Sequence, residues 1–146
     1  MNRRQIITAG AMLTAMSASA LAQTTDHSHD HAGHGSAAPT ALLDTAATCV
    51  KVGQVCLDHC LVAFAANDTS LAACARSSDQ MTSICATLAK LASSSSPYLP
   101  AMAKVALAAC QDCEKECKKH ADKHASCKAC AEACAACAAE CKKIAA

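Results

Sequence analysis

Five cysteines near the end of the sequence recur at a spacing that an α-helix brings onto one face. They are Cys127, Cys130, Cys134, Cys137 and Cys141, separated by 3, 4, 3 and 4 residues. This is the a/d repeat of a heptad, so on a helix all five side chains lie along one stripe. Lys128 and Glu132 fall on the opposite face. The segment is therefore predicted to be an amphipathic helix whose buried stripe is made of thiols.

The other eight cysteines follow the same periodicity in three earlier segments. One stripe contains Cys49, Gly53, Cys56 and Cys60; a second contains Cys74, Met81 and Cys85, adjoined by Leu71, Leu88 and Leu91; a third contains Ala103, Ala106, Cys110, Cys113 and Cys117. From residue 41 onward the chain is dominated by Ala, Leu, Cys, Lys and Glu. This composition favours helix over strand, so four helices with cysteines on one face are predicted.

Turn-forming residues separate these four helices. Residues 67–70 offer a turn and an N-cap, residues 93–100 form a Ser- and Pro-containing loop, and residues 120–122 are polar. We expect helices near 41–66, 70–92, 98–119 and 122–144. Short connections make successive helices antiparallel, and a bundle buries its a/d stripes. Residues 41–146 are therefore predicted to form an all-α domain, an antiparallel up-and-down four-helix bundle with a cysteine-lined core.

The N-terminal residues are interpreted as an export signal. Residues 1–22 combine the pair Arg3-Arg4, an apolar stretch and a small-residue cleavage pattern, as in a twin-arginine signal peptide. A membrane anchor is the alternative, and the Thr and Ser residues within the apolar stretch argue against it. No later stretch is expected to approach the ~18 apolar residues of a membrane span. We expect export by the twin-arginine route to the periplasm, an oxidising compartment.

Residues 23–40 form a polar tract that contains His27, His29, His31 and His34. Such a tract cannot bury enough apolar surface to fold, so a flexible tail is predicted. A His-rich tract can also capture metal ions, and this alternative stays open.

Charge and composition narrow the classes of function. The formal net charge is +1, from 13 basic and 12 acidic side chains, which argues against nucleic-acid binding. The chain has no Trp, one Phe and one Tyr, so large rings cannot fill the core. Thirteen cysteines in 146 residues reach the range typical of disulfide scaffolds and metal sites.

The cysteines allow three interpretations. Cysteine can act as a small hydrophobe, but an inert core would use Leu and Ile. A disulfide scaffold suits an exported protein, although thirteen is odd and a scaffold needs no helical repeat. Soft-metal binding is the third. Helix positions i and i+4 lie about 5–6 Å apart, close to the roughly 4.5 Å between two thiolates on a linear ion.

Cu(I) fits this third interpretation. It is a soft ion that prefers thiolate and thioether ligands. Zinc sites and iron–sulfur clusters usually place their cysteines in loops rather than along a helix. One Cu(I) per thiolate also leaves no net charge in a core of low dielectric constant, whereas divalent ions at that ratio would leave a large positive charge.

With these features the sequence resembles the exported branch of the bacterial copper storage proteins. The resemblance rests on the twin-arginine leader, the His-rich tail, the four Ala-rich helices and the helical Cys-x-x-Cys and Cys-x-x-x-Cys runs. It implies storage of about one Cu(I) per cysteine, up to ~13 per monomer, for supply to copper enzymes such as a particulate methane monooxygenase. The resemblance also implies a homotetramer. It further implies that all thirteen cysteines are Cu(I) ligands: Cys49, Cys56, Cys60, Cys74, Cys85, Cys110, Cys113, Cys117, Cys127, Cys130, Cys134, Cys137 and Cys141.

Sequestration for detoxification would use the same ligands and stays open, as does a disulfide-rich structural protein. Enzymatic activity is not expected, because no βαβ context surrounds a Cys-x-x-Cys pair and no Ser, His and Asp constellation shares a face.

Other candidate residues lie at the edges of the cysteine stripes. Met81 is either a thioether ligand or core filler, and His59 is either a ligand at the mouth of the core or a surface histidine. His120 and His124 flank the turn at the same end, where solvation is favoured. This end is the predicted entrance for copper. Apolar residues are expected to close the other end: Leu88, Leu91, Leu99 and Met102.

Overall fold

The computed structural model describes residues 39–145. The predicted signal peptide and nearly all of the predicted His-rich tail therefore lie outside the described residues. The described chain contains four helices: α1 (Thr40–Ala65), α2 (Ala72–Ser93), α3 (Leu99–Lys118) and α4 (Ala125–Ile144). Each predicted helix boundary lies within three residues of the observed one.

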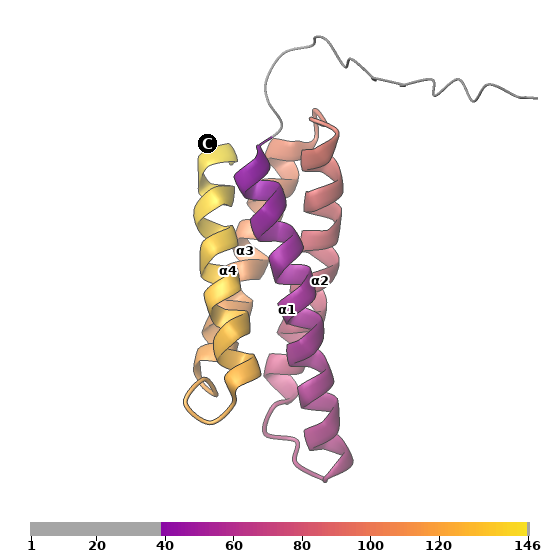
Figure 1. Cartoon of the computed structure of the whole chain (residues 1–146), viewed down its shortest axis with the longest axis vertical. Coiled ribbons are helices and arrows are strands. Elements are labelled where there is room, and N and C mark those ends of the chain that lie inside the picture. The colour runs from indigo at the N-terminus through magenta and orange to yellow at the C-terminus, as the bar shows by residue number, and fades with distance from the viewer. Residues whose placement is uncertain (1–38, 146) are drawn as a thin grey trace, which may run out of the picture. The chain divides into compact units, whose positions relative to one another are not determined.

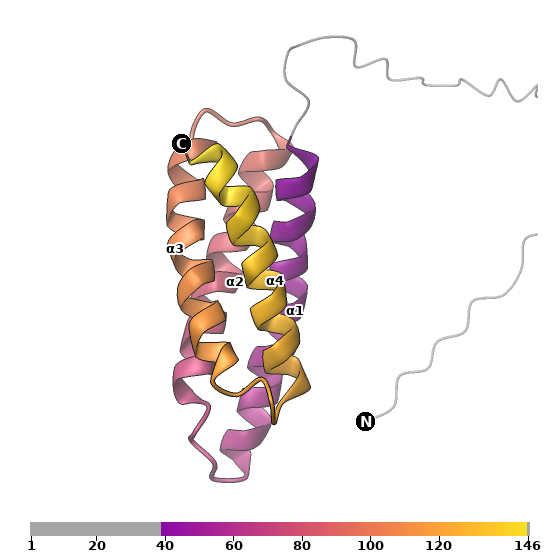
Figure 2. The same ribbon diagram turned by 90° about the vertical axis from the view of Figure 1, so that its left-hand side faces the viewer.

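The four helices form the predicted up-and-down bundle. Each helix packs on two neighbours, so that α1 contacts α2 and α4 while α3 contacts α2 and α4. Figures 1 and 2 show the α1–α2 and α3–α4 connections at one end and the α2–α3 connection with the C-terminus at the other. We call the first end the histidine end, after His59, His120 and His124. The second is the leucine end, after Leu42, Leu88 and Leu99.

Burial of the heptad stripes holds the helices together. The cysteine stripes, with Ala46, Ala103 and Ala106, are inaccessible to solvent. The three ion pairs in the described chain, Lys118–Glu114, Lys119–Glu116 and Lys143–Glu140, are short-range contacts on exposed helix faces. Pairs of this kind contribute only a few tenths of a kcal/mol each. Packing of small apolar and sulfur-bearing side chains therefore decides the fold.

The start of α2 differs from the prediction. Residues 67–70 do form a turn, with Asn67 in the left-handed region at φ 62° and Asp68 accepting a hydrogen bond from Ser70 N at 2.9 Å. The helix itself begins at Ala72, without a side-chain cap. The expected N-cap within 67–70 is therefore wrong, because the Asp68 carboxylate closes the turn before the helix begins.

α1 is also more apolar than expected. By length and composition it is the one helix in residues 39–145 that could cross a membrane, with a mean hydropathy of 1.3. The prediction that no such stretch follows the leader is corrected on this point, since Cys, Ala, Val and Leu all raise hydropathy. In the bundle its cysteine stripe faces the core, while Val55, Leu61 and Val62 are more than half exposed.

Candidate metal centre

The interior of the bundle is a column of thiols. All thirteen cysteines are free and 0 % exposed. Each helix contributes its stripe because the 3- and 4-residue spacing keeps successive cysteines on the inner face. The predicted inward orientation of the thirteen side chains is confirmed, and the thiols form no disulfide.

Toward the histidine end the sulfur atoms lie within hydrogen-bonding distance of one another. Cys74 Sγ is 3.3 Å from Cys117 Sγ and 3.8 Å from Cys127 Sγ. Cys56 Sγ is 3.7 Å from Cys74 Sγ and 4.0 Å from Cys117 Sγ. Four helices thus supply one compact group of thiols, since Cys56, Cys74, Cys117 and Cys127 come from α1, α2, α3 and α4.

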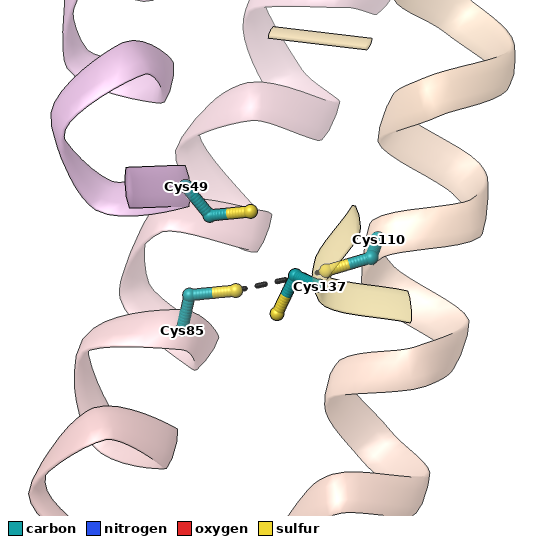
Figure 3. A group of neighbouring side chains, drawn as sticks. All are labelled: Cys49, Cys85, Cys110 and Cys137. Atoms are coloured by element: carbon teal, nitrogen blue, oxygen red, sulfur yellow. Dashed lines mark hydrogen bonds between the residues drawn. The ribbon is translucent and has the colours of Figure 1, made fainter. Parts of the chain in front are cut away.

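Nearer the leucine end a second group also draws one cysteine from each helix. The Sγ atoms of Cys49, Cys85, Cys110 and Cys137 all lie within 4.8 Å of one another. Figure 3 shows the four side chains pointing toward a common centre, with the Cys85–Cys110 contact of 3.7 Å drawn as a dashed line. Cys141 extends this group along α4, 4.0 Å from Cys137.

Ser78 is a core residue that the sequence analysis missed. Among residues 39–145 it is the only polar residue that is buried as a whole. Its Oγ lies 3.6 Å from the Sγ of Cys113 and 3.9 Å from that of Cys117. The available signal was its spacing, because Ser78 lies four residues after Cys74 and three before Met81 and so occupies a position on the α2 stripe.

Met81 is fully buried on the same stripe. It faces Gly53 of α1: a side-chain carbon added to Gly53 would lie 2.8 Å from Met81 Cε and would collide with the Thr82 hydroxyl. Gly53 therefore permits α1 and α2 to approach closely at the level of Met81. The burial of Met81 is compatible with both a thioether ligand and core filler, and its role as a ligand stays a prediction.

His59, the predicted histidine ligand, is paired with a second histidine. His59 and His124 are both half-buried, and His59 Nε2 lies 2.9 Å from His124 Nδ1. His120 stacks edge-on against His124, with ring centroids 6.4 Å apart. His59 adjoins Cys60 in sequence and His124 precedes Cys127 by three residues. Imidazoles thus gather at the histidine end, while Leu42, Leu88 and Leu99 close the leucine end.

Burial and mutual hydrogen bonding set the protonation of the thiols. Burial raises the pKa of the Cys60 thiol to about 11, and burial together with nearby Cys56 raises the pKa of Cys127. Hydrogen bonds from Cys117 lower the pKa of Cys113, and a hydrogen bond from Cys110 lowers that of Cys137. Most thiols are therefore protonated near pH 7 without metal, and metal binding must displace their protons.

The chemistry of this column suits a monovalent soft ion. Sulfur separations of 3.3–4.0 Å, and of up to 4.8 Å within the quartet, match two or three thiolates around one ion with bonds of about 2.3 Å. Among residues 39–145 no basic side chain is buried. A zinc ion with four thiolates would leave two uncompensated negative charges, whereas Cu(I) and thiolate in equal numbers are neutral.

Comparison with known proteins agrees with this chemistry. A family model described as copper storage protein matches residues 36–146. No curated protein matches the chain significantly. The chain is 31% identical to apo copper storage protein 3 from Bacillus subtilis, covering 73% of this chain and 98% of that one with a TM-score of 0.65.

Two copper-loaded structures are also similar. The Cu(I)-bound form of the Bacillus subtilis protein is 29% identical, covering 75% of this chain and 100% of that one with a TM-score of 0.66. The copper storage protein Ccsp from Streptomyces lividans, loaded with 10 copper equivalents, is 27% identical, with a TM-score of 0.67 and coverage of 74% and 83%.

Proposed function

The chain belongs to the copper storage protein family, and from this premise we propose that its bundle stores Cu(I) on the thiol column, at about one ion per cysteine. The observation that carries the proposal is the complete burial of thirteen free thiols in one neutral interior. A protein that transfers a single ion needs an exposed pair of ligands. Thirteen inaccessible thiols instead favour the storage of many Cu(I) ions.

The capacity follows from charge balance and ligand sharing. A two-coordinate Cu(I) needs two sulfurs, and a bridging thiolate serves two ions, so thirteen thiolates hold about 13 ions per monomer with no net charge. Loading releases about one proton per thiolate, because most of the thiols are protonated beforehand.

Copper reaches and leaves the column at the histidine end. The other end is sealed by Leu42, Leu88 and Leu99, whereas His59 and His124 are half-buried next to the first cysteines. Neutral imidazole is a ligand for copper, so the histidine pair offers an intermediate binding position. Replacing His59 and His124 with alanine should slow copper uptake several-fold and change the final capacity by no more than about one ion.

The stored copper supplies a copper enzyme outside the cytoplasm, such as a methane monooxygenase. One sequence feature supports this role: the twin-arginine pattern of residues 1–22, which is typical of proteins exported to the periplasm. Sequestration for detoxification is the competing role. Deletion of the gene separates the two: loss of copper-enzyme activity at low copper supports supply, and copper sensitivity alone supports detoxification.

The assembly we propose is a homotetramer. The outer face of α1 supports it, because Val55, Leu61 and Val62 are 56%, 53% and 63% exposed on one helix. Apolar side chains grouped on a surface are typical of interfaces between subunits.

Titration with Cu(I) tests the storage function directly. Fully reduced protein is titrated without oxygen against a chromophoric Cu(I) chelator, and the thiols are counted in parallel. Storage predicts more than ten tightly bound ions per monomer, and parallel titration with Zn²⁺ should show far fewer. Saturation at one or two ions, with one or two fast-reacting thiols, would instead indicate a redox or carrier protein.

A further inference from the structure

The sulfur contacts divide the thirteen thiols into two sets. The histidine-side set comprises Cys56, Cys60, Cys74, Cys113, Cys117, Cys127 and Cys130. The leucine-side set comprises Cys49, Cys85, Cys110, Cys137 and Cys141. Contacts of 3.3–4.0 Å run within each set, as between Cys113 and Cys130 at 3.7 Å and between Cys137 and Cys141 at 4.0 Å. Cys60 is assigned by its interactions with Cys56 and Cys74, and Cys49 by its place within 4.8 Å of the other quartet thiols. Cys134 belongs to neither set and lies between them.

The boundary between the sets is made by residues of α1 and α2 that carry no thiol. On α1 the stripe position between Cys49 and Cys56 is Gly53, and on α2 the positions between Cys74 and Cys85 are Ser78 and Met81. We call Gly53, Ser78 and Met81 the waist. All three are buried, and each takes a stripe position that lies between two cysteines of its helix.

The distances at the waist are too long for copper to bridge along α1 or α2. Successive thiols there are separated by seven residues on α1 and eleven on α2, or about 10 Å and 16 Å at 1.5 Å per residue. Two thiolates on one linear Cu(I) are only about 4.5 Å apart. On α3 and α4 the largest interval is four residues, about 6 Å.

Two sulfur-bearing side chains lie between the two sets of thiols. Cys134 Sγ lies within 4.8 Å of those of Cys113 and Cys130 in the histidine-side set. It also interacts with Cys110 and Cys49 of the leucine-side set. Met81 is fully buried at the waist, and the missing side chain of Gly53 leaves room for the Met81 methyl group. Thioether sulfur is a soft ligand for Cu(I), whereas the Ser78 hydroxyl is a poor one.

We propose that the waist divides the store into two copper clusters that fill in sequence, with Cys134 and the Met81 thioether as stepping ligands between them. This inference rests on the proposed storage function. Ions arriving at the histidine end occupy the seven thiols of the histidine-side set first. They reach the five thiols of the leucine-side set through the waist, because Leu42, Leu88 and Leu99 close the far end.

The first experiment follows copper uptake in time. The reduced full chain is mixed with Cu(I) on a weak chelator, and formation of copper–thiolate bonds is followed by ultraviolet absorbance. We expect two phases, the first of about seven ions and the second of about five to six, from the number of thiols in each set. The double variant Cys134→Ala/Met81→Leu should keep the rate of the first phase, slow the second at least tenfold, and lose about one ion of capacity.

Control variants distinguish an effect at the waist from the general effect of removing a sulfur atom. Met102→Leu removes a thioether that lies near the leucine end and outside both sets of thiols. It should leave the capacity and the rate of the second phase unchanged. Met81→Cys places a thiol at the waist and should accelerate the second phase.

A second measurement needs no variant. After loading with seven equivalents of Cu(I), a short pulse of iodoacetamide in denaturant labels the metal-free thiols, and peptide mapping identifies them. We expect label on Cys49, Cys85 and Cys110 and protection of Cys56 and Cys117. Uniform labelling, or wild-type filling in one phase, would overturn the division and leave storage intact. Failure of the reduced chain to take up more than one or two ions would overturn storage and the division together.

Discussion

Simultaneous replacement of Cys130, Cys134 and Cys137 by alanine is the sharpest test of the thiol column. The three residues lie on consecutive turns of α4 and contact thiols of both the histidine-side and the leucine-side set. Cys130 contacts Cys113 at 3.7 Å, and Cys137 is a member of the quartet. All three are 0 % exposed, so the substitutions change the interior and leave the surface as it is.

The expected loss of copper follows from ligand sharing. With each thiolate bridging two ions and each ion bound to two thiolates, capacity equals the number of thiolates, so three are lost at minimum. The neighbours Cys113 and Cys110 also lose bridging partners, which can release one or two more ions. Capacity should therefore fall from about 13 to between about 8 and 10 ions per monomer.

The fold should survive the same change. Removing one buried heavy atom from a core side chain costs on the order of 1 kcal/mol, so the triple variant loses about 3 kcal/mol before any compensation. Alanine has the highest helix propensity, which offsets part of this cost. The far-ultraviolet circular dichroism spectrum should remain helical, with a lower midpoint of thermal unfolding for the metal-free protein.

The assay is the chelator titration, run beside a surface control. Lys128→Ala/Glu132→Ala alters the exposed face of the same helix and should keep full capacity. If the triple variant is folded and still binds about 13 ions, the buried thiols are not the ligands and the assignment is refuted.

Three further predictions concern packing, pH and assembly. Gly53→Ala should lower the unfolding free energy by about 1 kcal/mol despite its gain in helix propensity, and adding Thr82→Ala should restore it by removing the clashing hydroxyl; no recovery in urea unfolding would contradict this contact. The pKa of Cys60 is raised by burial to about 11, so protonation favours the folded state. Cys60 alone should therefore account for a loss of about 2 kcal/mol as the pH rises from about 9 to about 11, measured by urea unfolding as the difference between the metal-free wild-type chain and Cys60→Ala; the same pH profile for both would contradict this. Leu61→Ser/Val62→Ser should convert the proposed tetramer into smaller species in light scattering without loss of copper per monomer; an unchanged mass would place the interface elsewhere.

The helices and their inner faces could be predicted from the sequence. A spacing of 3 and 4 residues places side chains on one face of any α-helix, because 3.6 residues make one turn. That face is buried when its side chains are apolar. This reasoning places Cys49, Cys110 and Cys141 on inner faces from periodicity alone, and all three are buried in the bundle. The same reasoning failed at the start of α2, because the Asp68 carboxylate accepts a hydrogen bond from Ser70 N in the preceding turn instead of capping the helix. Helical periodicity does not detect such a contact.

The grouping of the thiols was decided by tertiary structure alone. Whether Cys74 meets Cys117 or Cys85 meets Cys110 depends on the rotation and axial offset of helices far apart in the sequence, and heptad positions do not specify either. The contact between Met81 and Gly53, and the hydrogen bond between His59 and His124, arise in the same way. The sequence determined that thiols face inward, and the packing of four helices determined which thiols are close enough to share an ion.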